Sequence, residues 1–423
     1  MAREMKNSGV KWIGEIPKGW EVKRLKNLFV LKTGTTPKKY ENGLDTDPLI
    51  NWFTPADVAE MNCELKESQR YLSKIVVDNE RIRLYPQGSL IFVAIGASAG
   101  KIGYAQIEGY SNQQITALIP KENCYSKYSY YCMLIDRKRI RDNALYTTLP
   151  IINNAYLSSI KTLVPPLPEQ QAIADFLDAK CAEIDGLLAD LDAEVKTLAE
   201  YKKSIIAETV TRGLNPNAPM KQSGIPWAET IPAHWRIQKG KYAFCLLQRP
   251  VKEDDGVITC FRDGEVTLRS NRREDGFTMS AKEYGYQGIE PGDLVVHGMD
   301  GFTGSIGISD SRGKGTPVLN VLDSDHNKRY LMYYLRNMAY GDVFLALSTG
   351  IRVRSCDLSW KKLGEIRIVL PPIEEQNAIA AYLDKKCAII EQSIADKQTQ
   401  IETLKSYKAS LIYEYVTGKK QVI

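Results

Sequence analysis

The sequence predicts an α+β protein made of two mixed α/β domains and two long helices, arranged as an internal duplication. One observation is that a segment with helical periodicity recurs 206 positions later without a gap. A second is that each copy is preceded by a divergent region in which a Gly-rich piece still aligns. With 423 residues, 43% of them hydrophobic and 25% charged, the chain has enough material for two or three domains.

Three matching blocks define the duplication. Residues 165–178 (PPLPEQQAIADFLD) match 371–384 (PPIEEQNAIAAYLD), and a block at the front of each half matches between 8–20 and 223–235. The offset is 206 for the first pair and 215 for the second, so the material between the blocks has changed length. Only the Gly-rich piece within this material still aligns, between 88–103 and 292–307. Each half is therefore expected to be a divergent domain followed by a well-matched terminal segment.

Each terminal segment has the spacing of a long helix, with apolar residues three and four positions apart. The predicted seam positions are Leu177, Ile184, Leu188, Leu191, Val195, Leu198 and Ile205 in the first copy, and Leu383, Ile390, Ile394, Ile401, Leu404 and Leu411 in the second. Lys397 is the one seam position that departs. About 44 residues at 1.5 Å each make a rod of roughly 65 Å, which is marginal as a lone helix in water. We therefore expect the two helices to pair as a coiled coil.

The order of the segments predicts that the two helices run antiparallel. A short linker joins the end of the first helix to the second domain, so this end should lie beside the start of the second helix. The arrangement has a pseudo-two-fold axis, and the coil could work as a ruler or only as a two-helix staple. The predicted segments are a first domain at 1–163, a helix at 164–212, a linker at 213–222, a second domain at 223–370, a helix at 371–418 and a tail at 419–423.

Positive charge is concentrated in the globular domains. Residues 1–163 carry a net charge of +7 and residues 213–370 carry +3, whereas the helical segments 164–212 and 371–418 carry −5 and −2. This division favours domains that contact phosphates and helices that contact another protein.

Signals for metal binding and catalysis are weak. Eight cysteines and three histidines are scattered without a C-x-x-C pair, so no zinc site is expected. The segment 96–101 has three residues between its glycines where a phosphate-binding loop has four, and we expect a strand-to-strand turn there. Asp57, Glu64 and Lys66 have the residue types of a metal-dependent nuclease, which leaves a catalytic nuclease subunit as an alternative. Without a signal peptide or a long apolar run, a cytoplasmic location is expected.

These features resemble the DNA specificity (S) subunit of type I restriction-modification systems, over essentially the whole chain. The resemblance rests on the two helical segments that open with Pro-Pro-x-x-Glu-Gln, at 165–170 and 371–376. It also rests on the Ser-Gly block that begins each half, with its tryptophans at Trp12, Trp20, Trp227 and Trp235. In the second block Ala228 and Glu229 stand where the first has Ile13 and Gly14.

The resemblance implies a function without catalysis by this chain. Each globular domain would be a target-recognition domain that reads one half of a split, asymmetric target in double-stranded DNA. The helices would dock two methyltransferase (modification) subunits that use S-adenosylmethionine to methylate adenine, and motor-nuclease (restriction) subunits powered by ATP would join them. No cofactor is expected on this chain itself, whereas S-adenosylmethionine, ATP and magnesium are expected on the partner subunits. A coiled-coil adaptor that binds no DNA is a further alternative.

Charge and hydrogen-bonding capacity nominate residues for DNA contact, because Lys and Arg bind guanine edges and phosphates while Gln suits adenine edges. The predicted DNA-binding residues are Lys38, Lys39, Lys101, Gln113, Gln114, Arg272, Arg273, Arg352 and Arg354.

Overall fold

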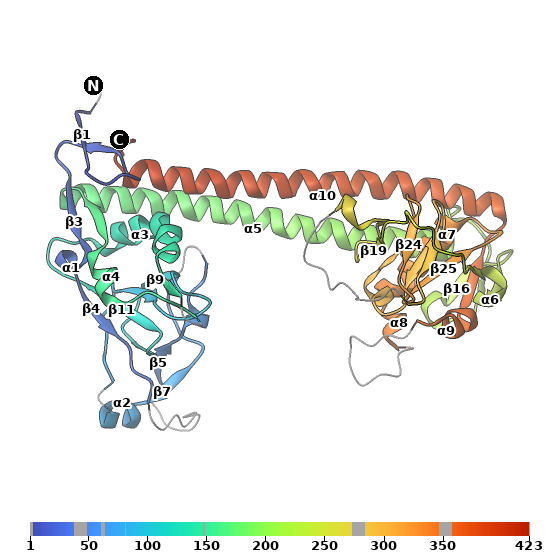
Figure 1. Cartoon of the computed structure of the whole chain (residues 1–423), viewed down its shortest axis with the longest axis horizontal. Coiled ribbons are helices and arrows are strands. Elements are labelled where there is room, and N and C mark those ends of the chain that lie inside the picture. Colours follow the sequence, from blue (N-terminus) through green and yellow to red (C-terminus); the bar gives the residue numbers. More distant parts are fainter. Residues whose placement is uncertain are drawn as a thin grey trace. The chain divides into compact units, whose positions relative to one another are not determined.

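The structure is a computed structural model that describes residues 3–37, 49–60, 64–80, 82–146, 149–272, 284–346 and 358–422. The chain forms two compact units, unit 1 (Met1–Leu191 with Thr399–Ile423) and unit 2 (Asp192–Gln398). Each unit contains one globular domain and parts of two long helices, α5 (Leu167–Arg212) and α10 (Ile373–Val416) (Figure 1). The predicted α+β composition is confirmed.

The domain of unit 1 is built on a five-stranded sheet with the order β4-β11-β8-β9-β6. Its strands are β4 (Phe29–Thr33), β11 (Ile115–Pro120), β8 (Leu90–Val93), β9 (Ile102–Ala105) and β6 (Glu64–Leu65). Pairing is antiparallel except between β6 and β9. A second sheet, β10-β5-β7, consists of β10 (Tyr110–Ser111), β5 (Leu49–Phe53) and β7 (Tyr71–Ser73). Helix α3 (Ser126–Asp142) lies between the main sheet and α5 (Figure 1).

The domain of unit 2 has a four-stranded antiparallel sheet with the order β18-β25-β22-β23. Its strands are β18 (Cys245–Leu246), β25 (Leu319–Asp323), β22 (Leu294–His297) and β23 (Ile306–Ile308). Two further two-stranded ladders belong to this domain, a hairpin of β19 (Ile258–Cys260) with β20 (Val266–Leu268) and the antiparallel pair of β21 (Gln287–Ile289) with β24 (Gly313–Gly315). Helix α7 (Lys328–Tyr340) takes the place that α3 has in unit 1 (Figure 1).

The two domains share one scaffold. The order β4-β11-β8-β9 in unit 1 corresponds to β18-β25-β22-β23 in unit 2. Short helices also correspond, α1 (Leu25–Leu28) to α6 (Gly240–Ala243) and α4 (Asn154–Ser159) to α9 (Trp360–Glu365). A two-stranded ladder precedes each long helix, formed by β3 (Glu21–Arg24) with β14 (Lys161–Val164) and by β17 (Arg236–Lys239) with β26 (Arg367–Leu370). The duplication seen in the sequence therefore extends into the domains, where sequence similarity has nearly disappeared.

The remaining elements are local additions to this scaffold. Each opening block forms a two-stranded ladder, β1 (Met5–Asn7) with β2 (Glu15–Pro17) and β15 (Met220–Gln222) with β16 (Thr230–Pro232). Unit 1 also has α2 (Lys74–Glu80) and the ladder of β12 (Leu145–Tyr146) with β13 (Pro150–Ile151), and unit 2 has α8 (Val343–Ala346). Single 3₁₀ turns are η1 (Pro55–Asp57), η2 (Pro226–Ala228), η3 (Arg269–Asn271) and η4 (Gly301–Thr303).

Within each unit the parts of α5 and α10 pack together along their apolar positions. The residues that the sequence places on the seam are all buried or half-buried. In unit 1 Asp185 of α5 forms an ion pair with Lys408 of α10, and the rings of Phe176 and Tyr415 lie 4.4 Å apart. Phe176 contacts Tyr415, and the later residue Asp185 of α5 contacts the earlier residue Lys408 of α10. The two helix segments of this unit are therefore antiparallel.

Unit 2 contains the corresponding helix contact with the two helices exchanged. Lys202 of α5 lies 2.5 Å from Glu391 of α10. Both residues stand 206 positions from their counterparts in unit 1, because Lys202 corresponds to Lys408 and Glu391 to Asp185. Lys397, which departs from the apolar seam, forms an ion pair with Glu194 and so keeps a charge partner at a half-buried position.

Each long helix ends on a glycine that packs against a tryptophan. Gly213 has φ +77°, and a Cβ atom there would lie 3.0 Å from Trp235. Gly418 has φ +72°, and a Cβ atom there would lie 3.0 Å from Trp20. Glycine adopts this left-handed conformation without the steric cost that other residues incur. The helix ends therefore reach the tryptophan of each unit's opening block.

Candidate nucleic-acid interface

Two turns meet at the end of β8 in unit 1. The turn 96–101 joins β8 to β9, as the sequence predicts, and the turn 112–114 joins β10 to β11. The amide of Val93 donates to the Lys101 carbonyl at 2.9 Å, and the amide of Ala94 donates to the Gln114 carbonyl at 2.8 Å. The structure thus brings Lys101, Gln113 and Gln114 to one end of the sheet, although they are separated in sequence.

The three side chains at this end differ in freedom. Gln113 is exposed, whereas Gln114 accepts a hydrogen bond from the Asn112 side chain at 3.0 Å. Lys101 lies 3.4 Å from Glu60, which also pairs with Arg137 at 2.7 Å. Burial opposes ionisation of Glu60, but Arg137 and Lys101 together hold its pKa below the usual value. Gln113 is therefore the most available of the three for a ligand.

The chain also leaves β4 beside this surface. The amide of Gly34 donates to the Ile115 carbonyl and that of Thr35 to the Ser111 carbonyl, each at 2.9 Å. The segment that carries Lys38 and Lys39 continues from here, and both lysines lie outside the described residues.

The end of α3 adds positive charge near the same turns. The Arg141 guanidinium donates to the Ala97 carbonyl at 3.2 Å, and Lys138 is exposed. Arg139 instead pairs with Asp136 at 2.6 Å and lies 5.5 Å from the Trp12 ring. Arg139 therefore serves packing, while Lys138 and Arg141 remain on the surface.

The matching turn of unit 2 joins β22 to β23 and contains η4. The Nδ1 atom of His297 accepts hydrogen bonds from the amides of Met299 at 3.2 Å and Asp300 at 3.0 Å. Burial lowers the pKa of His297, while Asp300 opposes this shift, so the ring is held neutral in the form that accepts these bonds. The histidine thereby shapes a turn whose Met299 is half exposed.

Arg272 directly follows η3 and has acidic partners on the adjacent hairpin of β19 with β20. Its guanidinium lies 2.8 Å from Asp263 and 3.1 Å from Glu265, and stacks 4.2 Å from the Phe261 ring. Arg262 of the same hairpin is 69% exposed and lies 3.7 Å from Asp300, which links the hairpin to the η4 turn. Sequence reasoning selected Arg272 and missed Arg262. Three further predicted contacts lie outside the described ranges: Arg273, Arg352 and Arg354.

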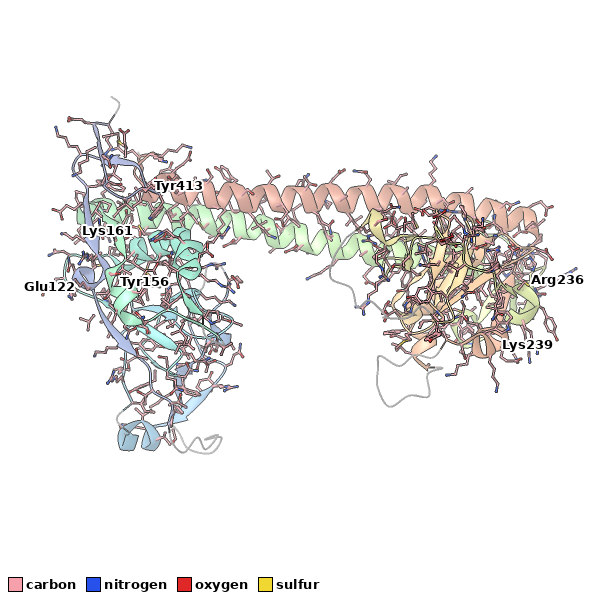
Figure 2. The ribbon with its side chains drawn as sticks, viewed as in Figure 1. Glu122, Tyr156, Lys161, Arg236, Lys239 and Tyr413 are labelled. Atoms are coloured by element: carbon pink, nitrogen blue, oxygen red, sulfur yellow. The ribbon has the colours of Figure 1, made fainter. Side chains whose placement is uncertain are left out.

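Other cations of unit 2 lie on or beside the ladder of β17 with β26. Arg236 and Lys239 project from β17 at the edge of the unit (Figure 2). Lys239 forms an ion pair with Glu365 at 2.6 Å, and Lys241 pairs with the same carboxylate at 2.9 Å. One carboxylate, that of Glu365, thus holds two lysines beside the ladder of β17 and β26.

In the alternative nuclease site Asp57 has partners of its own, whereas Glu64 and Lys66 lie within ion-pair distance of each other. Asp57 accepts from the amides of Thr54 at 2.7 Å and Gln69 at 2.8 Å. Glu64 forms a closer ion pair with Lys127, and the Lys66 ammonium lies 4.0 Å from the Glu64 carboxylate. Among the residues that the structure describes, no group of three His, Cys, Asp or Glu side chains is placed to hold a metal ion.

Behind each surface, the Glu-Gln pair that opens a long helix holds the domain. In unit 1 Glu169 accepts from the Trp20 indole at 2.9 Å. Gln170 accepts from the Tyr125 amide at the start of α3 and donates to the Pro165 carbonyl, both at 2.9 Å. The buried amide side chain thus satisfies backbone groups on both elements.

Unit 2 repeats this junction. Glu375 accepts from the Trp235 indole at 2.9 Å. Gln376 accepts from the Asn327 amide at 2.9 Å and donates to the Pro371 carbonyl at 2.8 Å. The matched motifs therefore attach each domain to its helix, which explains why they persist while the domains diverge.

This fold defines a class of duplicated α+β proteins, in which each domain is attached to a long helix and presents polar turns at the ends of its strands. A family model described as the type I restriction modification DNA specificity domain matches residues 17–197. The chain is 23% identical to the type I restriction enzyme MjaIX specificity subunit of Methanocaldococcus jannaschii, over 97% of this chain and 95% of that protein. It is 21% identical to the EcoDI specificity subunit of Escherichia coli, over 92% and 87%.

A solved structure shares the fold. This structure concerns complex assembly and conformational transition of the type I R-M system, and one of its chains superposes with a TM-score of 0.71 at 15% identity, covering 96% of this chain and 99% of that one. Over nearly its whole length the chain is thus similar to type I restriction enzyme specificity subunits, and residues 17–197 match the model of the type I restriction modification DNA specificity domain. None of the described helices has the length and apolar character needed to cross a membrane.

Proposed function

We propose that each globular domain reads one half of a split, asymmetric DNA target on behalf of a type I restriction-modification complex. The observation that carries this proposal is a single scaffold that occurs twice and presents different side chains from corresponding strand ends. Unit 1 offers Lys101, Gln113 and Gln114 there, and unit 2 offers Arg262 and the His297 turn. Different groups on one scaffold suit the reading of two different half-sites.

The chemistry of these groups fits base and phosphate contacts. Glutamine side chains bind the edge of adenine through two hydrogen bonds, and arginine binds guanine or phosphate. Exposed cations such as Lys138 and Arg262 would add a salt-dependent attraction to the DNA backbone. Lys38, Lys39, Arg273, Arg352 and Arg354 stay predictions for further contacts.

The chain would contribute binding without catalysis. S-adenosylmethionine would be used by two methyltransferase subunits, and ATP and magnesium by motor-nuclease subunits. The partner assignment is supported by the similarity to specificity subunits, and by the acidic character of the helical segments, which suits contact with another protein. The nuclease alternative is weakened by the separate partners of Asp57 and Glu64.

We infer that α5 and α10 form an antiparallel coiled coil that spaces the two recognition domains. Their buried seam and the exchanged ion pairs of Lys202 and Lys408 support this role. Seven residues inserted after both Leu191 and Lys397 would preserve the heptad and add about 10 Å, or about three base pairs. Sequencing of methylated sites should then show a longer unread gap. An unchanged gap with full activity would identify the coil as a staple.

Two measurements test the division of labour. The isolated chain should transfer no label from S-adenosylmethionine to DNA. Label should be incorporated only when a separate methyltransferase chain is added. Replacement of residues 22–160 by the counterpart from a relative should change one half of the methylated sequence, whereas replacement of 237–366 should change the other. A change of both halves by one replacement would contradict independent reading.

A further inference from the structure

A short segment of each domain is retained although the surrounding sequence has diverged. Residues 127–131 of α3 read Lys-Tyr-x-x-Tyr, and residues 329–333 of α7 read Arg-Tyr-x-x-Tyr. Their offset is 202, whereas the long helices match at 206. We call each one a docking segment, because all three of its shared side chains contact a long helix or its neighbouring strand.

The cation and the second tyrosine of each docking segment bind one aspartate. In unit 1 the Tyr131 hydroxyl donates to Asp178 of α5 at 2.6 Å, and Lys127 lies 3.3 Å from the same carboxylate. In unit 2 the Tyr333 hydroxyl donates to Asp384 of α10 at 2.8 Å, and Arg329 lies 2.7 Å from it. These aspartates belong to the helix that follows each domain.

The first tyrosine of each docking segment reaches the end of the other long helix. The Tyr128 hydroxyl donates to the Val416 carbonyl of α10 at 2.9 Å. The Tyr330 hydroxyl lies 3.4 Å from the Val210 carbonyl of α5 and 2.8 Å from the Val369 carbonyl of β26. One helix of each domain therefore contacts both members of the helix pair in its own unit.

The ionisation states of these groups suit the contacts. Burial and the Asp178 carboxylate raise the pKa of the Tyr131 hydroxyl, which keeps the proton that it donates. Burial disfavours the charge on Lys127, but Glu64 and Asp178 outweigh this and raise its pKa. Lys127 also lies 4.5 Å from the centre of the Tyr104 ring. The contact is thus a charge-assisted one that depends on geometry.

Matching clefts border the two aspartate contacts. The cleft in unit 1 has a volume of about 660 Å³ and is lined by Lys127, Tyr131 and Asp178, among others. The cleft in unit 2, of about 580 Å³, is lined by the corresponding Arg329, Tyr333 and Asp384. Because solvent reaches one side of each contact, its main role is to orient the domain and not to bury apolar surface. Removal of one hydroxyl therefore leaves the surrounding core in place.

We propose that the docking segments are positioning elements for DNA recognition: they set the orientation of each domain on the helix pair and so the alignment of its reading surface with its half-site. The inference rests on the proposed function and adds residues to it. Together with the Glu-Gln junction, attachment points on two different helices resist rotation of the domain. Domains with different reading surfaces would then be held in equivalent orientations by two shared tyrosines and one cation.

The test uses the full chain with its methyltransferase partner and three DNA duplexes. The unread gap between the two half-sites has the correct length in one duplex, and is one base pair shorter or one base pair longer in the other two. Tyr131→Phe removes the hydroxyl that binds Asp178 while keeping the ring. We expect the preference for the correct gap to fall about five- to tenfold, with the base preference within each half-site unchanged. Tyr333→Phe should act in the same way through unit 2.

Tyr407→Phe is the matched control, because Tyr407 of α10 is 55% exposed and should leave the gap preference as in the wild type. Lys127→Arg, which installs the cation of unit 2, should retain it. Unchanged gap preference in Tyr131→Phe and Tyr333→Phe would overturn the proposal, as would a changed base preference within a half-site. A thermal midpoint close to that of the wild type would show that each variant is folded.

A second readout separates this inference from the proposed function. Hydrogen exchange of α3 in the full chain without DNA should accelerate in Tyr131→Phe and in Asp178→Asn, with no further increase in the double variant. Failure of the wild type to bind any duplex would refute the proposed function and leave this coupling intact. Independent, additive effects of the two substitutions would refute the docking contact itself.

Discussion

Unit 1 and unit 2 are most alike where each domain meets the long helices and least alike where the strands end in solvent. At the junction, Trp20 and Trp235 make the same bond to a glutamate, at the same distance of 2.9 Å. At the strand ends, unit 1 presents a Gln-rich turn and unit 2 a turn shaped by His297. The comparison teaches that attachment and reading are carried by separate parts of one scaffold, so that one can change without the other.

The largest expected effect comes from the shared tryptophans. Trp20 and Trp235 are both fully buried, so Trp20→Ala or Trp235→Ala should reduce the free energy of unfolding of its own unit by about 3–5 kcal/mol. Hydrogen exchange resolved by unit measures this loss. Trp227 is half-buried, and Trp227→Ala should cost less. Equal losses in both units from one substitution would show that the units do not unfold separately.

A smaller effect is expected from the exchanged ion pairs, which differ in burial. The Lys408 side chain is 2% exposed beside Asp185, whereas the Lys202 side chain is 18% exposed beside Glu391. Lys408→Ala should destabilise unit 1 by about 1–2 kcal/mol, since a buried partner is removed from a partly exposed carboxylate. Lys202→Ala should cost less than about 1 kcal/mol.

Denaturant unfolding of the two lysine variants supplies the measurement. High salt should reduce the cost of Lys202→Ala more than that of Lys408→Ala, because exposed pairs are screened more strongly. If the costs were equal at every salt concentration, burial would not be what distinguishes the two units here.

The smallest expected effect is a pH response confined to unit 2. The pKa of His297 is lowered by burial from its ordinary 6.5, so its contribution to stability is complete above about pH 6.5 and is lost as the pH falls through the folded-state pKa. Exchange of the Met299 and Asp300 amides, corrected for intrinsic rates, should therefore accelerate as the pH falls below about 6.5.

The matched turn of unit 1 supplies the control for this response. Val93 stands at the position that corresponds to His297, so amides of the turn 96–101 should show no such acceleration. His297→Gln should abolish the response in unit 2. Acceleration of equal size in both turns would assign it to another group.

The sequence predicts the long helices and their seam well, because periodicity and self-similarity are local signals. It also predicts the turn at 96–101 from its glycines. The docking segments escaped detection because their offset of 202 differs from that of the helices, and a five-residue match with three identities or near-identities is weak without geometry. Their significance appears only when Tyr131 is seen to meet Asp178, 47 positions away.

Prediction of the reading surface from charge alone is less secure, since ion pairing depends on neighbours brought close by folding. In the sequence Arg272 belongs to a basic cluster that looks free of partners. In the structure its guanidinium lies between Asp263 and Glu265 of a hairpin. Arg262, which was not selected, is more exposed. Gln113 is exposed and stays a predicted DNA contact, and its proximity to Lys101 follows from the pairing of β8 with β9 and β11.

The most direct test of independent reading is to sequence the sites methylated by two double variants, each assembled with the methyltransferase partner. Gln113→Ala with Gln114→Ala alters unit 1, and Arg262→Ala with Arg272→Ala alters unit 2. Loss of a bidentate base contact costs about 1–3 kcal/mol of discrimination, so each variant should relax base preference in one half of the target and leave the other half intact. The account would be contradicted if one double variant relaxed the base preference in both halves of the target. It would also be contradicted if neither double variant relaxed the base preference in any half.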